Sequence, residues 1–85
     1  MEDIRQRLKE VLSQQFPDSE LEIVSSGSDR VGGLLIWKRF EGQEQIERQR
    51  SVWSTLRRML NTDEQLQVSS LLTLTPEEMA VARQG

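Results

Sequence analysis

The chain has 85 residues, of which 11 are Lys or Arg and 14 are Asp or Glu, with no His and no Cys. A chain of this length folds as one small domain, so residues 1–85 are predicted to form a single unit. The absence of Cys and His excludes disulfides, thiolate and imidazole metal sites, Cys nucleophiles and His-dependent triads. We therefore predict no enzyme, no cofactor and no metal.

The net charge of −3 is mild and argues against bulk attraction to nucleic acid or anionic lipid. The longest apolar run, residues 31–37, contains two glycines and is shorter than the ~20 residues that a membrane helix needs. The N-terminus is charged from its second residue, which is unlike a signal peptide. We expect a cytoplasmic protein with no membrane contact.

The first segment has apolar residues at helical spacing, at Ile4, Leu8, Val11 and Leu12. This spacing predicts a helix with one apolar face. Pro17 ends the helix, because the residue before a proline is pushed out of the helical region.

Two strands are predicted next, at residues 20–25 and 34–40. The first alternates polar and apolar residues, and the second is apolar on both faces at its start. The loop between them, residues 25–33, is rich in Ser and Gly, and its length favours a hairpin.

The second half of the chain repeats the alternation of helix and strand. A helical pattern covers residues 43–60, an alternating strand covers residues 66–74, and Thr75-Pro76-Glu77-Glu78 starts a short terminal helix. The predicted fold class is α+β, in the order α-β-β-α-β-α. We expect a three-stranded mixed sheet with the two long helices packed on one face.

One stretch resembles the signature of the BolA-like family. It reads Phe40-Glu41-Gly42, five further residues, and then Arg48-Gln49-Arg50, with Trp53 and Leu56 at matching positions. The segment 71–78 is similar to the family's last strand and its Thr-led terminal helix. The resemblance implies a class II KH-like fold without the Gly-x-x-Gly nucleic-acid loop.

The resemblance also implies where an iron–sulfur cluster shared with a monothiol glutaredoxin would be ligated. The family's His near the start of the last strand falls on Gln67, and the His of Arg-His-Arg falls on Gln49. The loop that supplies a further ligand is shortened to residues 25–33, without His or Cys. Since amides are poor iron ligands, we expect the family fold without the family's cluster chemistry.

Basic residues concentrate in the segment 38–58, which carries a net charge of +3. Six side chains are the candidate anion or nucleic-acid contacts: Lys38, Arg39, Arg48, Arg50, Arg57 and Arg58. The alternative is a solvated polar face, with Arg48 and Arg50 paired to Glu44 or Glu47. The absence of Tyr and of paired exposed aromatics favours this alternative.

An apolar patch around Trp37 is the candidate partner surface. If Ile36 points at the helices, then Trp37 lies on the open face of the sheet beside Leu35 and Leu71, and binds a protein partner or a second copy. The alternative is that the terminal helix covers this face. The predicted function is a small binding or regulatory domain that acts through protein contact without iron–sulfur ligation, and the alternative is a KH-like RNA or DNA binder.

Overall fold

The computed structural model describes residues 3–26 and 30–84. Its elements, in chain order, are α1 (Ile4–Gln15), β1 (Glu20–Ser26), β2 (Val31–Ile36), a 3-10 turn η1 (Lys38–Phe40), α2 (Gln45–Met59), α3 (Thr62–Leu66), β3 (Val68–Leu74) and α4 (Pro76–Gln84). No helix in the described residues has the length and hydropathy needed to cross a membrane.

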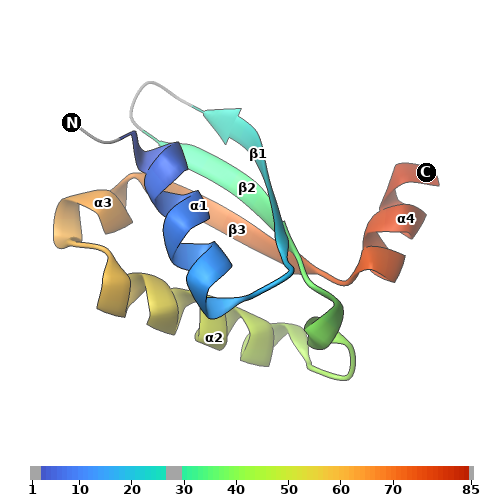
Figure 1. Ribbon diagram of the computed structural model, residues 1–85. Helices are drawn as coiled ribbons and strands as arrows, with labels where there is room; N and C mark the ends of the chain where they lie inside the picture. The colour runs from blue at the N-terminus through green and yellow to red at the C-terminus, as the bar shows by residue number, and fades with distance from the viewer. Residues whose placement is uncertain (1–2, 27–29, 85) are drawn as a thin grey trace.

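The three strands form one sheet in the order β1-β2-β3, in which β1 and β2 are antiparallel and β2 and β3 are parallel. Figure 1 shows α1 and α2 on one face of this sheet, while α4 stands apart from them at the end of β3. The predicted fold class and the mixed sheet are therefore confirmed. The core lies between the two long helices and the sheet, and its most deeply buried side chains are Leu8, Val11, Leu12, Leu35, Phe40, Val52, Leu56 and Leu71.

The first helix begins and ends as the local sequence requires. The Asp3 carboxylate accepts a hydrogen bond from the Arg5 amide at 2.9 Å and caps the helix start. At the other end, the Phe16 amide donates to the Leu12 carbonyl, and Pro17 follows outside the helix. The prediction that Pro17 ends this helix is confirmed.

The second strand begins three residues earlier and ends four residues earlier than predicted. Its glycines, Gly32 and Gly33, belong to β2 and not to the preceding loop, whereas residues 38–40 form a 3-10 turn. A Cβ atom on Gly33 would lie 2.7 Å from the Glu22 carbonyl oxygen. Gly33 therefore allows β1 and β2 to approach each other closely. The prediction that it belongs to the loop was wrong. Residues 27–29 of the predicted loop lie outside the described residues.

A short helix that was not predicted, α3, precedes the last strand. Asn61 caps it, and the Glu64 side chain bonds back to the Asn61 amide at 3.0 Å, which completes a capping box. This Asn-x-x-Glu pattern was present in the sequence and would have identified the helix. As a result, β3 begins at Val68 and not at residue 66.

Candidate functional site

The Phe-x-Gly motif forms the turn that leads from the sheet into α2. Phe40 is completely buried, where it packs against Phe16 and Trp37 with ring centroids 6.0 and 5.1 Å away. Gly42 has φ of +81°, a conformation that residues with a Cβ atom rarely adopt. The motif therefore sets the path of the backbone, and its aromatic residue is part of the core.

Arg48, on the first turns of α2, joins three separate segments of the chain. Its Nε donates to the Gln43 carbonyl at 2.9 Å, and its Nη1 donates to the Thr73 carbonyl at 3.3 Å and to the Glu78 carboxylate at 2.7 Å. Its guanidinium also lies over the Phe40 ring, 5.6 Å from the centroid. Because its side chain is only 6% exposed, Arg48 is a structural link and not a surface cation.

Gln49 links α2 to the outer edge of β3. Its Nε2 donates to the Leu71 carbonyl at 2.7 Å and to the Thr73 hydroxyl at 3.3 Å, and its Oε1 accepts from the Trp53 indole at 3.0 Å. Gln45 acts in the same way, donating to the Thr73 carbonyl at 3.0 Å. Both ends of the Gln49 amide are therefore engaged within the fold.

Gln67 lies at the end of α3, just before β3. Its Nε2 donates to the Asp63 carbonyl at 3.4 Å, and its backbone carbonyl accepts from the Val31 amide at 2.7 Å. The residue therefore contributes to the helix end and to the start of the β2–β3 pairing.

Glu78 is the titratable group most tightly coupled to this network. The hydrogen bond from Arg48, and then the backbone amide of Thr75, hold the pKa of the Glu78 carboxyl below its ordinary value near 4.5. Because folding lowers this pKa, the unfolded chain binds the proton more tightly than the folded chain does. The stabilisation is complete above the unfolded-state pKa and is lost as the pH falls through the folded-state pKa.

We therefore expect wild type to be more stable than Glu78→Gln at neutral pH and to lose this advantage as the pH falls below about 4.5. Urea denaturation of both proteins at a series of pH values measures the difference. An advantage that stays constant down to pH ~3 would show that the carboxylate charge of Glu78 contributes nothing.

The candidate partner surface was placed on the wrong face of the sheet. Leu35 is 0% exposed and Leu71 is 2% exposed, and both belong to the core under the helices. Trp37 packs against Phe16 at 5.0 Å, and its indole donates to the Pro17 carbonyl at 2.8 Å. Since Trp37 faces the helices, the neighbouring Ile36 faces the other side of the sheet, which is the reverse of the prediction. Ile36 is only 6% exposed there, so this side is covered at the end of β2.

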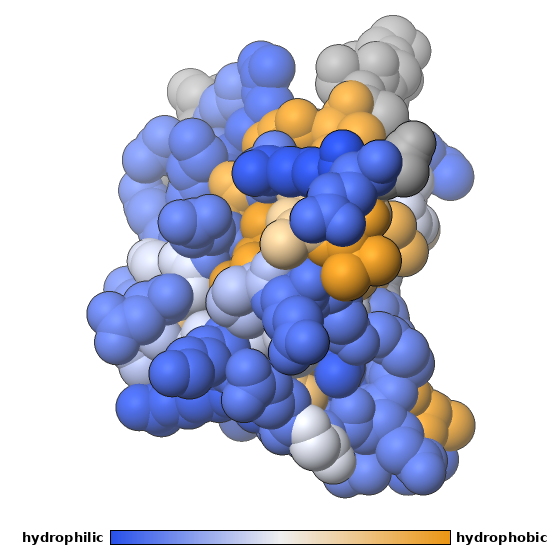
Figure 2. Space-filling model, turned by 90° about the vertical axis from the view of Figure 1, so that its right-hand side faces the viewer, coloured by the Kyte–Doolittle hydropathy of each residue, from blue (hydrophilic) through white to orange (hydrophobic). Residues whose placement is uncertain are grey.

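The open face carries the alternate residues of the three strands. Glu22, Leu34 and Leu72 are paired across one row of the sheet, and their side chains face the open side. Leu72 is 57% exposed and Val24, further along β1, is 63% exposed. Figure 2 shows hydrophobic side chains gathered in the upper half of the side that carries α4, with hydrophilic side chains around them.

The terminal helix covers this face only in part. Arg83, near its end, donates to the Glu22 carboxylate at 2.7 Å, which brings α4 toward β1. Met79 is half-buried, whereas Val81 is 63% exposed and contributes little cover. The apolar row at Leu34 and Leu72 therefore remains accessible.

The six candidate basic residues do not form one continuous site. Arg48 is buried, so it is removed from the candidate anion contacts, and it pairs with Glu78 and not with the predicted Glu44 or Glu47. Lys38 and Arg39 lie on η1, before α2 begins, whereas Arg57 and Arg58 lie in its last turn. The two groups are separated by most of a helix about 22 Å long, with the exposed Arg50 between them.

Solved structures share this arrangement of elements. The chain matches BolA1 from Arabidopsis thaliana with a TM-score of 0.67 and 26% identity, over 92% of this chain and 98% of that one. It matches a BolA protein homologue from Coxiella burnetii with a TM-score of 0.61 and 29% identity, over 92% of each chain. This chain has the fold of the BolA-like proteins and is similar to them in sequence.

A Bol-like protein from Babesia bovis has the same fold, with a TM-score of 0.59 and 23% identity, over 92% of this chain and 91% of that one. No protein-family model and no curated protein sequence matches this chain. The resemblance in the Phe-x-Gly and Arg-x-Arg motifs is thus supported by structural similarity along most of the chain.

The residues present do not fit an iron–sulfur cluster held in the way that the family resemblance implies. The Gln49 amide is engaged at both ends, by Leu71 and by Trp53. Gln67 presents an amide where the family has an imidazole, and the shortened loop contains no His or Cys. Amide oxygen and nitrogen are much weaker iron ligands than imidazole or thiolate.

Proposed function

We propose that this BolA-like protein is a non-enzymatic binding or regulatory domain that contacts another protein and does not ligate an iron–sulfur cluster. The observation that carries the proposal is the apolar row on the open face of the sheet, where Leu72 is 57% exposed next to the half-buried Leu34. An exposed apolar side chain that extends an apolar row on a sheet face is a typical anchor for a protein partner.

The charges around this row support a partner with basic groups. Glu22 lies in the same row, and the exposed Glu20 lies two residues away on the same face of β1. Arg83 neutralises Glu22 in the free protein, which leaves Glu20 without a partner among the described side chains. Opposite charges across an interface favour association and select against acidic partners.

The proposal is tested by affinity capture from the native host, followed by binding measurements on the purified partner. Leu72→Asp should weaken that binding at least tenfold, because it places a charge in the apolar row. Leu66→Asp is the matched control, since Leu66 is 64% exposed on α3 and should bind like wild type. Equal affinities for the two variants would contradict the proposed surface.

The second half of the proposal is tested by anaerobic reconstitution with iron, sulfide and a monothiol glutaredoxin. We expect no visible absorption band that depends on this chain. A band that appears with wild type and is lost in Gln49→Ala or Gln67→Ala would contradict the absence of cluster ligation.

A further inference from the structure

The two edge strands of the sheet, β3 and β1, differ in whether side chains bond to their outward-facing backbone groups. On β3, the carbonyl oxygens that point away from β2 belong to Leu71 and Thr73, because the Leu74 carbonyl pairs inward with the Trp37 amide. Side chains of α2 bond to both: Gln49 to Leu71 at 2.7 Å, and Gln45 to Thr73 at 3.0 Å. This edge is therefore closed to a further strand.

The edge at β1 has no such cover within the described part of the chain. Among the described residues, no side chain forms a hydrogen bond to the backbone of residues 20–24. The register shift between Ile23 and Ser25 interrupts regular pairing at the far end of the strand. Residues 20–24 thus present a short row of outward backbone groups, which is a template for pairing with another extended segment.

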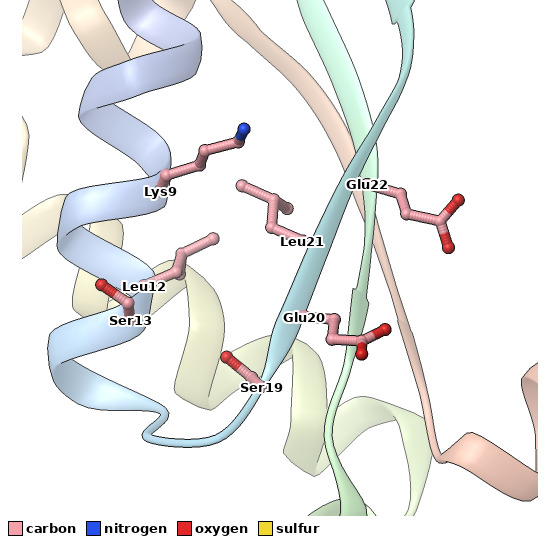
Figure 3. A pocket seen from close by; sticks show the side chains of 7 residues that line it. All are labelled: Lys9, Leu12, Ser13, Ser19, Glu20, Leu21 and Glu22. Carbon is pink, nitrogen blue, oxygen red and sulfur yellow. The ribbon is translucent and has the colours of Figure 1, made fainter.

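A hollow of about 420 Å³ lies beside this edge, between α1 and β1. Its lining includes two apolar residues, Leu12 and Leu21, and five polar or charged ones, Lys9, Ser13, Ser19, Glu20 and Glu22. Figure 3 shows Leu21 pointing toward α1 and Lys9 reaching from α1 toward the strand, whereas the side chains of Glu20 and Glu22 point to the other side of β1.

We propose that the β1 edge binds an extended segment of a partner protein as a fourth strand. This inference rests on the proposed function, since it states how the partner is held. Cross-strand pairing dictates the sequence of that segment, because neighbouring side chains on one face lie about 5 Å apart. One basic residue faces Glu20, and a second faces Glu22, where it competes with Arg83 for the carboxylate. The alternate residues enter the hollow as apolar side chains, with a carboxylate near Lys9.

A second copy of the chain is disfavoured as the occupant. A two-fold pairing of two β1 strands must keep Leu21 on the helix side in both copies, which places Glu20 and Glu22 of both copies on one face. If the pairing is centred on Glu22, the two Glu22 carboxylates are directly opposite, and if it is centred on Ile23 they are diagonal neighbours. Like charges in such positions are destabilising, and the Arg83 that pairs with each Glu22 offsets only part of this repulsion.

The test uses a peptide with the sequence Lys-Val-Lys-Glu-Lys-Val-Lys and the intact protein at low salt. We expect saturable binding, with slower hydrogen exchange at alternate backbone amides of residues 20–24 and unchanged exchange in α2. Two further peptides carry N-methyl groups, one on its odd residues and the other on its even residues. Each lacks the backbone N–H donors along one edge of the peptide strand, so one of the two should bind and the other should not. Equal binding by both would overturn strand addition.

Charge variants test the predicted pattern. Glu20→Lys and Lys9→Glu should each weaken peptide binding about threefold or more, whereas Glu47→Lys, on the exposed side of α2, should not. If the peptide binds through Leu72 without protecting β1, this inference fails while the proposed function stands. If β1 becomes protected with rising protein concentration and no peptide, the occupant is a second copy and the inference is wrong.

Discussion

Replacing Arg48 with methionine is expected to lower the free energy of unfolding by about 3 kcal/mol. The substitution keeps an apolar stem of similar length but removes the donors to the Gln43 carbonyl, the Thr73 carbonyl and the Glu78 carboxylate. Charge-assisted hydrogen bonds contribute roughly 1.5–3 kcal/mol each, and the avoided desolvation of the guanidinium offsets part of the loss. For a domain of this size, that change is a large part of the total stability.

Urea denaturation followed by tryptophan fluorescence measures this loss, since Trp37 and Trp53 are both half-buried. Arg50→Met is the matched control: it is the same substitution two residues away on α2, at an exposed position. We expect the control to change stability by less than about 0.5 kcal/mol. Similar effects at both positions would show that the contacts of Arg48 do not hold the three segments together.

Leu71→Ala is the second substitution with a large expected effect, a loss of about 3 kcal/mol. Leu71 is 2% exposed and packs in the core between β3 and the helices. The truncation removes buried methyl groups and leaves a cavity that close-packed neighbours fill only in part. The same change at the adjacent Leu72, which is 57% exposed, should cost less than about 1 kcal/mol.

This pair of variants decides which face of β3 is covered by the helices. Chemical denaturation gives the two free energies under identical conditions. A larger loss for Leu72→Ala than for Leu71→Ala would reverse the assignment of the faces and would remove Leu72 from the proposed partner surface. Binding of the protein partner should show the opposite order, with Leu72 the sensitive position.

The faces of the strands could not be assigned from the sequence, for a physical reason. β2 is apolar on both sides, so alternation gives no signal about which of Leu35 and Ile36 meets the helices. The register shift between Val31 and Gly32 breaks the regular alternation of β3, so that Val68 and Leu71, three residues apart, are both buried. Such a bulge depends on the neighbouring strand, and no local pattern predicts it.

The ion-pair partner of Arg48 could not be predicted from the sequence either. Within α2, the local partners Glu44 and Glu47 are the natural choices for its charge, because side chains three or four residues apart are neighbours on a helix. The actual partner, Glu78, lies 30 residues away and is brought close by the return of β3 to the sheet. Only the packing of β3 beside α2 makes this pair.

The sequence by itself determined the element order, the strand-turn-helix motif around Phe40 and Gly42, and the lack of every His and Cys ligand. These properties depend on local spacing and residue type, and both can be determined from the sequence alone. The tertiary structure alone decided which side of the sheet is buried, that Gln49 is engaged at both ends of its amide, and that β1 is the uncovered edge. These depend on contacts between distant segments, and their free energies are set by burial and by pairing across the sheet.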